Sequence, residues 1–134
     1  MIDIETQVFN YVATRVRAVY PGIFITGEYV RSPNSFPCIS IVETENEIDR
    51  NTRSADEIEN YIRDFYEVSV YSNKKTGKKS ECKEIIAEVD KHLKNLGFTR
   101  TMLSPVPNLE DASIYRMTAR YRAIVSKNEV IYRR

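Results

Sequence analysis

The segment between Ile114 and Val125 constrains the fold more than any other part of this sequence. Its side chains alternate in character, as they do in a β-strand whose successive residues point to opposite faces of a sheet. One set is Tyr115, Met117, Ala119, Tyr121, Ala123 and Val125, and the other is Arg116, Thr118, Arg120, Arg122 and Ile124. A strand this long needs partner strands and a covering layer over its apolar side. The chain is therefore predicted to build a sheet with one face buried.

Two amphipathic helices are predicted to supply the covering layer. The first runs from Ile4 to Val19, with Asp3 as its expected N-cap and Pro21-Gly22 as its stop signal. The second starts at Ser80 and ends at Gly97. Its apolar stripe consists of Cys82, Ile85, Ile86, Val89, Leu93 and Leu96. Each stripe covers one side of its helix, so both helices are expected to pack on the same sheet.

Further strands are predicted from runs of β-branched and aromatic residues. They occupy 23–30, 36–42, 61–71 and 98–103, and 129–134 is expected to add a short strand or an arm. The segments 36–42 and 61–71 are expected to pair as a long hairpin. The predicted fold class is α+β: a mainly antiparallel sheet of four to five strands, with two amphipathic helices packed on one face. At 134 residues, the chain is expected to form a single domain, 1–134.

Charge is balanced over the whole chain but not along it. Twenty basic and 19 acidic side chains give a formal charge of +1, which creates no global field to attract nucleic acid or an anionic membrane. Residues 43–60 carry seven acidic and two basic side chains, a net charge of −5, whereas 116–134 has a net charge of +5. Two interpretations stay open. These are either two solvated faces or complementary surfaces that bring one subunit against the next.

The complementary interpretation makes these charged residues the candidate contacts with partners. In the acidic segment they are Glu45, Glu47, Asp49, Arg50, Arg53, Asp56 and Glu57. In the loop predicted over 72–79 they are Lys74, Lys75, Lys78 and Lys79, and in the C-terminal part they are Arg116, Arg120, Arg122, Arg133 and Arg134.

No pattern in the sequence predicts catalysis, a metal ion or a cofactor. Cys38 and Cys82 are far apart and form no CxxC pair, so both are expected to be small buried thiols. His92 has Glu88 four residues before it, and we expect a solvated or half-buried structural histidine. Thr76-Gly-Lys-Lys79 lacks the first glycine and the final Ser or Thr of a phosphate-binding loop. We expect a protein that is not an enzyme.

No secretory signal or long apolar run is present, which predicts a soluble cytosolic product.

Two passages carry a family resemblance. They are Val70-Tyr-Ser-Asn-Lys-Lys-Thr-Gly-Lys-Lys-Ser80 and Leu96-Gly-Phe-Thr-Arg-Thr-Met-Leu-Ser-Pro-Val-Pro-Asn-Leu-Glu-Asp-Ala-Ser-Ile-Tyr-Arg-Met-Thr-Ala-Arg-Tyr121. With the order of the elements, they resemble the tail terminator or tail completion (head-tail joining) proteins of long-tailed bacteriophages and related prophage particles. These passages are packing, turn and strand signatures, so no catalytic residue is carried over.

The resemblance implies a small α+β subunit that assembles as a hexameric ring on the end of the tail tube. Such a ring stops polymerisation of the tube and offers the surface to which the head connector attaches. The implied partners are further copies of the chain, the tail tube protein, and a head connector, completion protein or tail cap. Non-specific contact with DNA in the lumen is also implied, but no membrane. The expected location is the tail end of a virion, after synthesis in the bacterial cytoplasm.

Two alternatives remain open from the sequence. A head-completion or connector protein has a similar size, but an all-helical connector subunit would lack the strands at 61–71 and 114–125. A small nucleic-acid-binding module would use the lysines of 72–79 with Arg120 and Arg122, and would stack bases on tyrosines. The tyrosines available for this are Tyr71, Tyr115 and Tyr121.

Overall fold

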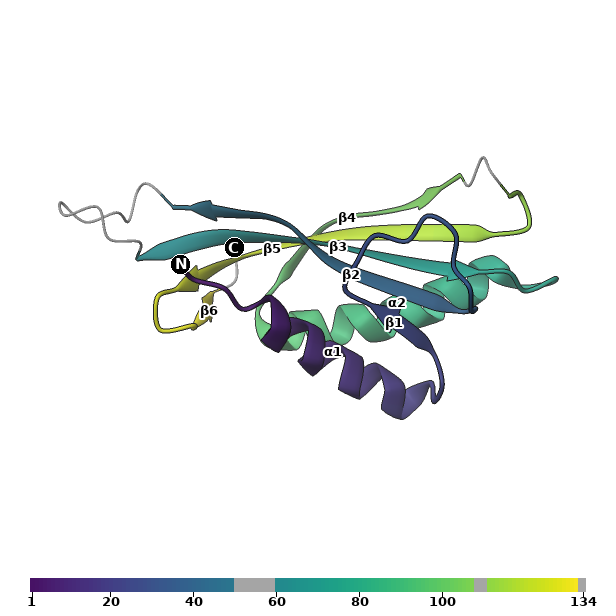
Figure 1. Cartoon of the computed structure of the whole chain (residues 1–134), viewed down its shortest axis with the longest axis horizontal. Helices are drawn as coiled ribbons and strands as arrows, with labels where there is room; N and C mark the ends of the chain where they lie inside the picture. Colours follow the sequence, from purple (N-terminus) through teal and green to yellow (C-terminus); the bar gives the residue numbers. More distant parts are fainter. Residues whose placement is uncertain (50–59, 108–110, 133–134) are drawn as a thin grey trace.

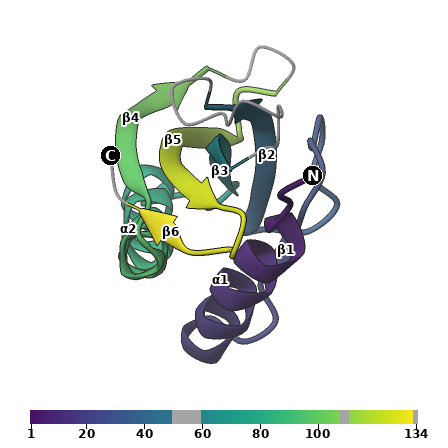
Figure 2. The same cartoon turned by 90° about the vertical axis from the view of Figure 1, so that its left-hand side faces the viewer.

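The computed structural model describes residues 1–49, 60–107 and 111–132. Along the chain the elements are α1 (Glu5–Val19), β1 (Phe24–Thr26), β2 (Cys38–Ile48), β3 (Tyr61–Ser72), α2 (Lys78–Leu96), β4 (Thr99–Val106), β5 (Tyr115–Ser126) and β6 (Ile131–Tyr132). Both helices lie on the same side of the strands (Figures 1 and 2). The α+β class and the one-sided helical layer predicted from the sequence are confirmed. No helix in the described ranges is long and apolar enough to cross a membrane.

The sheet has six strands, in the order β1-β2-β3-β5-β4, and β6 pairs with β5. All pairings are antiparallel except that of β1 with β2. The predicted hairpin of 36–42 with 61–71 is present, because Cys38 lies opposite Tyr71 and Ile48 lies opposite Ile62. The sheet has one strand more than the predicted four to five, and its two shortest strands, β1 and β6, span three and two residues and fall in the predicted segments 23–30 and 129–134.

The core lies between the helices and one face of the sheet, as the alternating pattern of β5 predicts. Met117, Ala119 and Tyr121 on β5 are each at most 2% exposed and belong to the same cluster as the apolar stripe of α2. Tyr66 of β3 meets Phe98 edge to face, with ring centroids 5.2 Å apart. Aromatic pairs in this geometry add stabilisation beyond the area that they bury.

Several element boundaries differ from the sequence prediction. The strand predicted over 23–30 shortens to β1, and the second helix starts at Lys78 rather than Ser80. The first turn of a helix needs no apolar side chains, so the lysines there gave no helical signal. Strand β4 continues to Val106, beyond the predicted end at 103, because an edge strand tolerates Pro105.

The expected N-cap of the first helix is also displaced by one residue. Ile4 occupies the capping position of α1, and it has no side chain that could cap the helix. Asp3 still accepts a hydrogen bond at Oδ1 from the backbone N of Glu5, at 3.1 Å. Asp3, the residue before the capping position, therefore satisfies one of the backbone N–H groups that the first turn of the helix leaves free.

The largest correction concerns the start of the acidic segment. Residues 43–48, which we expected to form part of a polar excursion, continue β2 and pair with β3 as far as Ile62. Their composition disfavours a strand, but pairing satisfies the backbone and places Glu45 and Glu47 where water reaches them. Pairing with β3 thus outweighs the low β-propensity of these residues.

Candidate interaction surfaces

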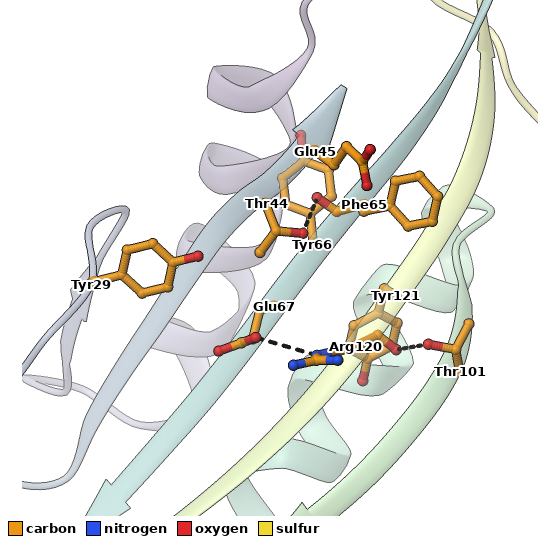
Figure 3. Close-up of a pocket in the computed structure, with 9 residues that line it drawn as sticks. All are labelled: Tyr29, Thr44, Glu45, Phe65, Tyr66, Glu67, Thr101, Arg120 and Tyr121. Carbon is orange, nitrogen blue, oxygen red and sulfur yellow. Dashed lines mark hydrogen bonds and ion pairs between the residues drawn. The ribbon is translucent and has the colours of Figure 1, made fainter. Parts of the chain in front are cut away.

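A hollow lies on the sheet across β2, β3, β5 and β4 (Figure 3). Its volume is about 410 Å³. The residues drawn around it in Figure 3 are Tyr29, Thr44, Glu45, Phe65, Tyr66, Glu67, Thr101, Arg120 and Tyr121. Two of the candidate charged residues, Glu45 of β2 and Arg120 of β5, line this hollow, so the description of the candidate site starts here.

Two β-bulges shape the hollow. One lies in β2 between Glu43 and Glu45, and the other lies in β4 between Arg100 and Met102. The hydroxyl of Thr44 donates to the carbonyl of Phe65 at 3.4 Å, and the hydroxyl of Thr101 donates to the carbonyl of Arg120 at 3.3 Å. A bulge bends its strand and increases the local twist. Both outer strands therefore bend at the same level of the sheet.

Glu67 of β3 binds two of the three candidate arginines of β5. Arg120 Nε donates to Glu67 Oε2 at 3.3 Å, and Arg116 Nη2 lies 3.5 Å from Glu67 Oε1. Arg116 also donates to the Ser69 hydroxyl at 3.2 Å, and its guanidinium lies 5.5 Å from the centre of the Tyr71 ring. The basic row predicted on β5 is therefore partly neutralised within the subunit. Arg120 keeps 62% of its side chain exposed, so its ion pair with Glu67 is worth little in water.

Arg122, the third of these arginines, is exposed on β5 and lies opposite Phe65 of β3 and Thr99 of β4. Arg116, Arg120 and Arg122 thus occupy alternate positions of one strand, as predicted, on the side of the sheet turned away from the core.

The acidic candidates of the described residues lie on and just after the end of β2. Glu47 pairs with Arg63 of β3, at 3.2 Å between Oε1 and Nη2. The side chain of Glu45 shares a hydrogen bond with Glu47, which raises the pKa of Glu45 together with slight desolvation and the charge of Glu47. Asp49 is 8% exposed, and its backbone N donates to the carbonyl of Tyr61. Glu45 and Glu47 lie in the second half of β2 and Asp49 directly after it, and their role as contacts stays a prediction.

The basic loop lies at the other end of β3. Lys74 and Lys75 are exposed, and Lys74 Nζ lies 3.7 Å from Glu81 Oε2. Lys78 and Lys79 belong to the first turn of α2 rather than to the loop in which we expected them. Because β3 runs from Tyr61 to Ser72, the acidic hairpin end and the lysines cannot meet within one subunit (Figure 1). Any contact between these two groups must join separate molecules.

Six candidate residues lie outside the described residues. They are Arg50, Arg53, Asp56, Glu57, Arg133 and Arg134. Their assignment as contacts stays a prediction.

The structure reveals a buried acidic group that our sequence analysis missed. Asp64 of β3 is 0% exposed, and neither carboxylate oxygen makes a hydrogen bond of standard geometry to the described residues. Its pKa is raised to about 9, first by burial and then by the neighbouring Glu43 and Asp3, against the opposing effect of Tyr66. Asp64 is therefore a neutral carboxylic acid at pH 7. Its position between Ile62 and Tyr66 on the buried side of the strand was the signal available in the sequence.

His92 and the two cysteines belong to the packed interior. Both cysteines are 0% exposed, as predicted, and burial raises the thiol pKa of Cys38 to about 11 and that of Cys82 to about 12. His92 is only 8% exposed, less than the solvated or half-buried histidine we expected, because its ring packs edge-on against Tyr11 of α1. Its Nε2 lies 2.8 Å from Glu88 Oε1. Within the described ranges, no group of three or more His, Cys, Asp or Glu side chains could hold a metal ion.

Comparison with known proteins gives a match of fold and none of sequence. No protein-family model and no curated protein matches this chain. Among solved structures, the fold is similar to that of a chain from the virion of a native gene transfer agent (GTA) particle, with a TM-score of 0.61 and 15% sequence identity. The similarity covers 91% of this chain and 91% of that chain. The two chains therefore share one fold over nearly their whole length.

Proposed function

We propose that this chain is a structural protein of a phage-like virion and acts as its tail terminator. In this role a ring of copies, six by family resemblance, caps the end of the tail tube, stops its polymerisation and presents a surface to the head connector. The observation that carries the proposal is the fold shared with a chain of a GTA virion over 91% of both lengths. The resemblance of 70–80 and 96–121 to tail terminator proteins supports the same role independently.

The distribution of charge favours assembly from identical subunits. The acidic end of the β2–β3 hairpin and the lysines after β3 lie at opposite ends of the subunit, so they can pair only between molecules. Unlike surfaces on one subunit generate head-to-tail contacts, which close into a ring when the rotation between neighbours allows it. This function needs no cofactor and no catalytic group.

The alternatives receive less support. The six-stranded sheet is incompatible with an all-helical connector subunit. A nucleic-acid module would use Arg120 and Arg122 with the lysines of 72–79, and Glu67 already pairs with Arg120 within the subunit. The tail terminator therefore remains the better proposal.

The mass of the purified protein in solution tests this function. Light scattering would be measured for the protein alone and after mixing with its tail tube protein, over a range of concentrations and salt. A six-fold mass, either free or only on the tube, is the expected result. A monomer that ignores the tube protein and binds DNA in a strongly salt-dependent way would instead support the nucleic-acid module.

A further inference from the structure

Two arginines of β5 converge on one carboxylate of β3. Arg120 Nε lies 3.3 Å from Glu67 Oε2, and Arg116 Nη2 lies 3.5 Å from Glu67 Oε1. Each carboxylate oxygen therefore faces a different guanidinium group, and Figure 3 shows the contact of Glu67 with Arg120 at the wall of the hollow. Two guanidinium groups directed at one anion are a donor set suited to a carboxylate or a phosphate.

Arg116 is also held in place by groups other than Glu67. Its Nη2 donates to the Ser69 hydroxyl at 3.2 Å, and its guanidinium lies 5.5 Å from the centre of the Tyr71 ring. The Ser69 hydroxyl forms a buried hydrogen bond of 3.0 Å with the hydroxyl of Thr118. We therefore expect Arg116 to keep its position when the charge of Glu67 is removed.

The two arginines are more accessible from water than the carboxylate between them. Glu67 lies opposite Arg120 in the sheet, and both lie with Arg116 on the side turned away from the core. Arg120 keeps 62% of its side chain exposed and Arg116 keeps 28%, whereas Glu67 keeps only 15%. An anion that approaches from solvent thus meets the guanidinium groups first.

The Glu67 carboxylate limits what can bind to these arginines. It uses hydrogen-bond donors of both guanidinium groups, and its charge repels a second anion at the same place. Its ion pair with the exposed Arg120 adds little to the stability of the fold. Glu67 therefore matters more for the exclusion of other anions than for folding.

The chemistry of the site favours a phosphate of a nucleic-acid backbone as the excluded anion. Arginine binds phosphate through two parallel hydrogen bonds, and hydroxyl side chains such as that of Ser69 are common partners of the same backbone. The site opens on a sheet face beside a hollow of about 410 Å³, which leaves space for the backbone around one bound phosphate.

We propose that Arg116 and Arg120 form a site for a nucleic-acid phosphate and that the Glu67 carboxylate blocks this site. Glu67 is then a specificity-determining residue, which allows the subunit to expose a basic strand without binding DNA through it. The inference does not depend on ring assembly, because all of its groups belong to one subunit.

Binding of a short fluorescent DNA duplex, measured by anisotropy, tests the inference. Glu67→Gln removes the charge and keeps the shape of the side chain. It is expected to lower the Kd by about tenfold and to steepen the fall of log K with log salt concentration by about one unit, the effect of one added phosphate contact. Glu84→Gln removes the same charge from the exposed side of α2 and is the matched control, with an unchanged Kd.

A second substitution shows where the gain arises. Glu67→Gln combined with Arg120→Gln should lose the gain, whereas Glu67→Gln combined with Arg17→Gln, at an exposed position of α1, should keep it. Glu67→Thr repeats the experiment with a residue that is favoured in strands. Thermal melting confirms that each variant is folded. Inorganic phosphate, compared with chloride at equal ionic strength, shows whether a free phosphate takes the place of the backbone.

The outcomes are distinct from those for the proposed function. Tighter DNA binding by the Glu67 variants that Arg120→Gln cancels supports the inference. It is overturned if neither Glu67 variant binds DNA more tightly than Glu84→Gln, if the gain survives Arg120→Gln, or if inorganic phosphate displaces the duplex completely. None of these results changes the mass of the ring, which is measured separately.

Discussion

Replacing Asp64 by asparagine should stabilise the free subunit, and the gain should depend on pH. The pKa of this carboxyl group is about 9 in the folded protein, whereas an aspartate in an unfolded chain titrates near about 3.9. Between these values the folded state holds a proton that the unfolded state has lost. The free energy of unfolding therefore falls as pH rises, by about 1.4 kcal/mol per pH unit, and the loss stops above the folded pKa.

At pH 7 this proton costs the fold on the order of 4 kcal/mol, and at pH 5 well under half as much. Asparagine has the same shape and no charge, so Asp64→Asn should recover most of that free energy at pH 7 and less at pH 5. Urea unfolding at pH 5, 7 and 8.5, followed by circular dichroism, measures both values. Glu84→Gln on the exposed side of α2 is the control for loss of one negative charge. A variant that is less stable than wild type, or that keeps the wild-type pH slope, would refute the reasoning.

Three further predictions concern the core and the basic strand. Leu93→Ala removes a side chain that is 0% exposed in the helix–sheet core, and it should lower the free energy of unfolding by about 2–5 kcal/mol in a urea titration. Gly97→Ala should cost about 1 kcal/mol or more in the same assay, because Gly97 has φ +111° and its new Cβ would stand 3.0 Å from Ile131 Cγ2. Reversing Arg120 and Arg122 together to Glu should weaken ring formation in light scattering without changing the monomer's melting temperature by more than a few degrees, and an unchanged oligomer would contradict their role in the contact.

The sequence predicts secondary structure and burial well where the apolar residues recur with the period of one element, a helix or a strand. On β5 the alternation from Tyr115 to Val125 places the correct residues inside, and on α2 the apolar stripe from Cys82 to Leu93 is fully buried. In both elements one side is apolar and the other polar, so only one orientation buries the apolar side. The stripe and the alternation thus determine the elements and the face that each one buries.

The sequence-based prediction fails where strand pairing or tertiary packing outweighs the secondary-structure preference of the residues themselves. The acidic residues of 43–48 join a strand because Tyr61–Phe65 offer a full set of backbone partners. Asp64 is buried because Ile62 and Tyr66, two residues before and after it, face the core. Side chains two residues apart in a strand lie on the same face. A pocket beside α1 combines residues from α1, the end of β1, β2 and β3. No local pattern encodes such a convergence.

The extra residue at Thr44 acts as a phase shift in β2. Before it, Glu43 points to the helical side and reaches Glu5 and Tyr66; after it, Glu45 and Glu47 point away from the helices. In a regular strand of the same sequence, without the bulge, the period of two would put all three carboxylates on a single face. The bulge at Thr44 therefore divides an acidic run between two surfaces: Glu43 joins Glu5 and Tyr66 on the helical side, and Glu45 and Glu47 lie on the outer side.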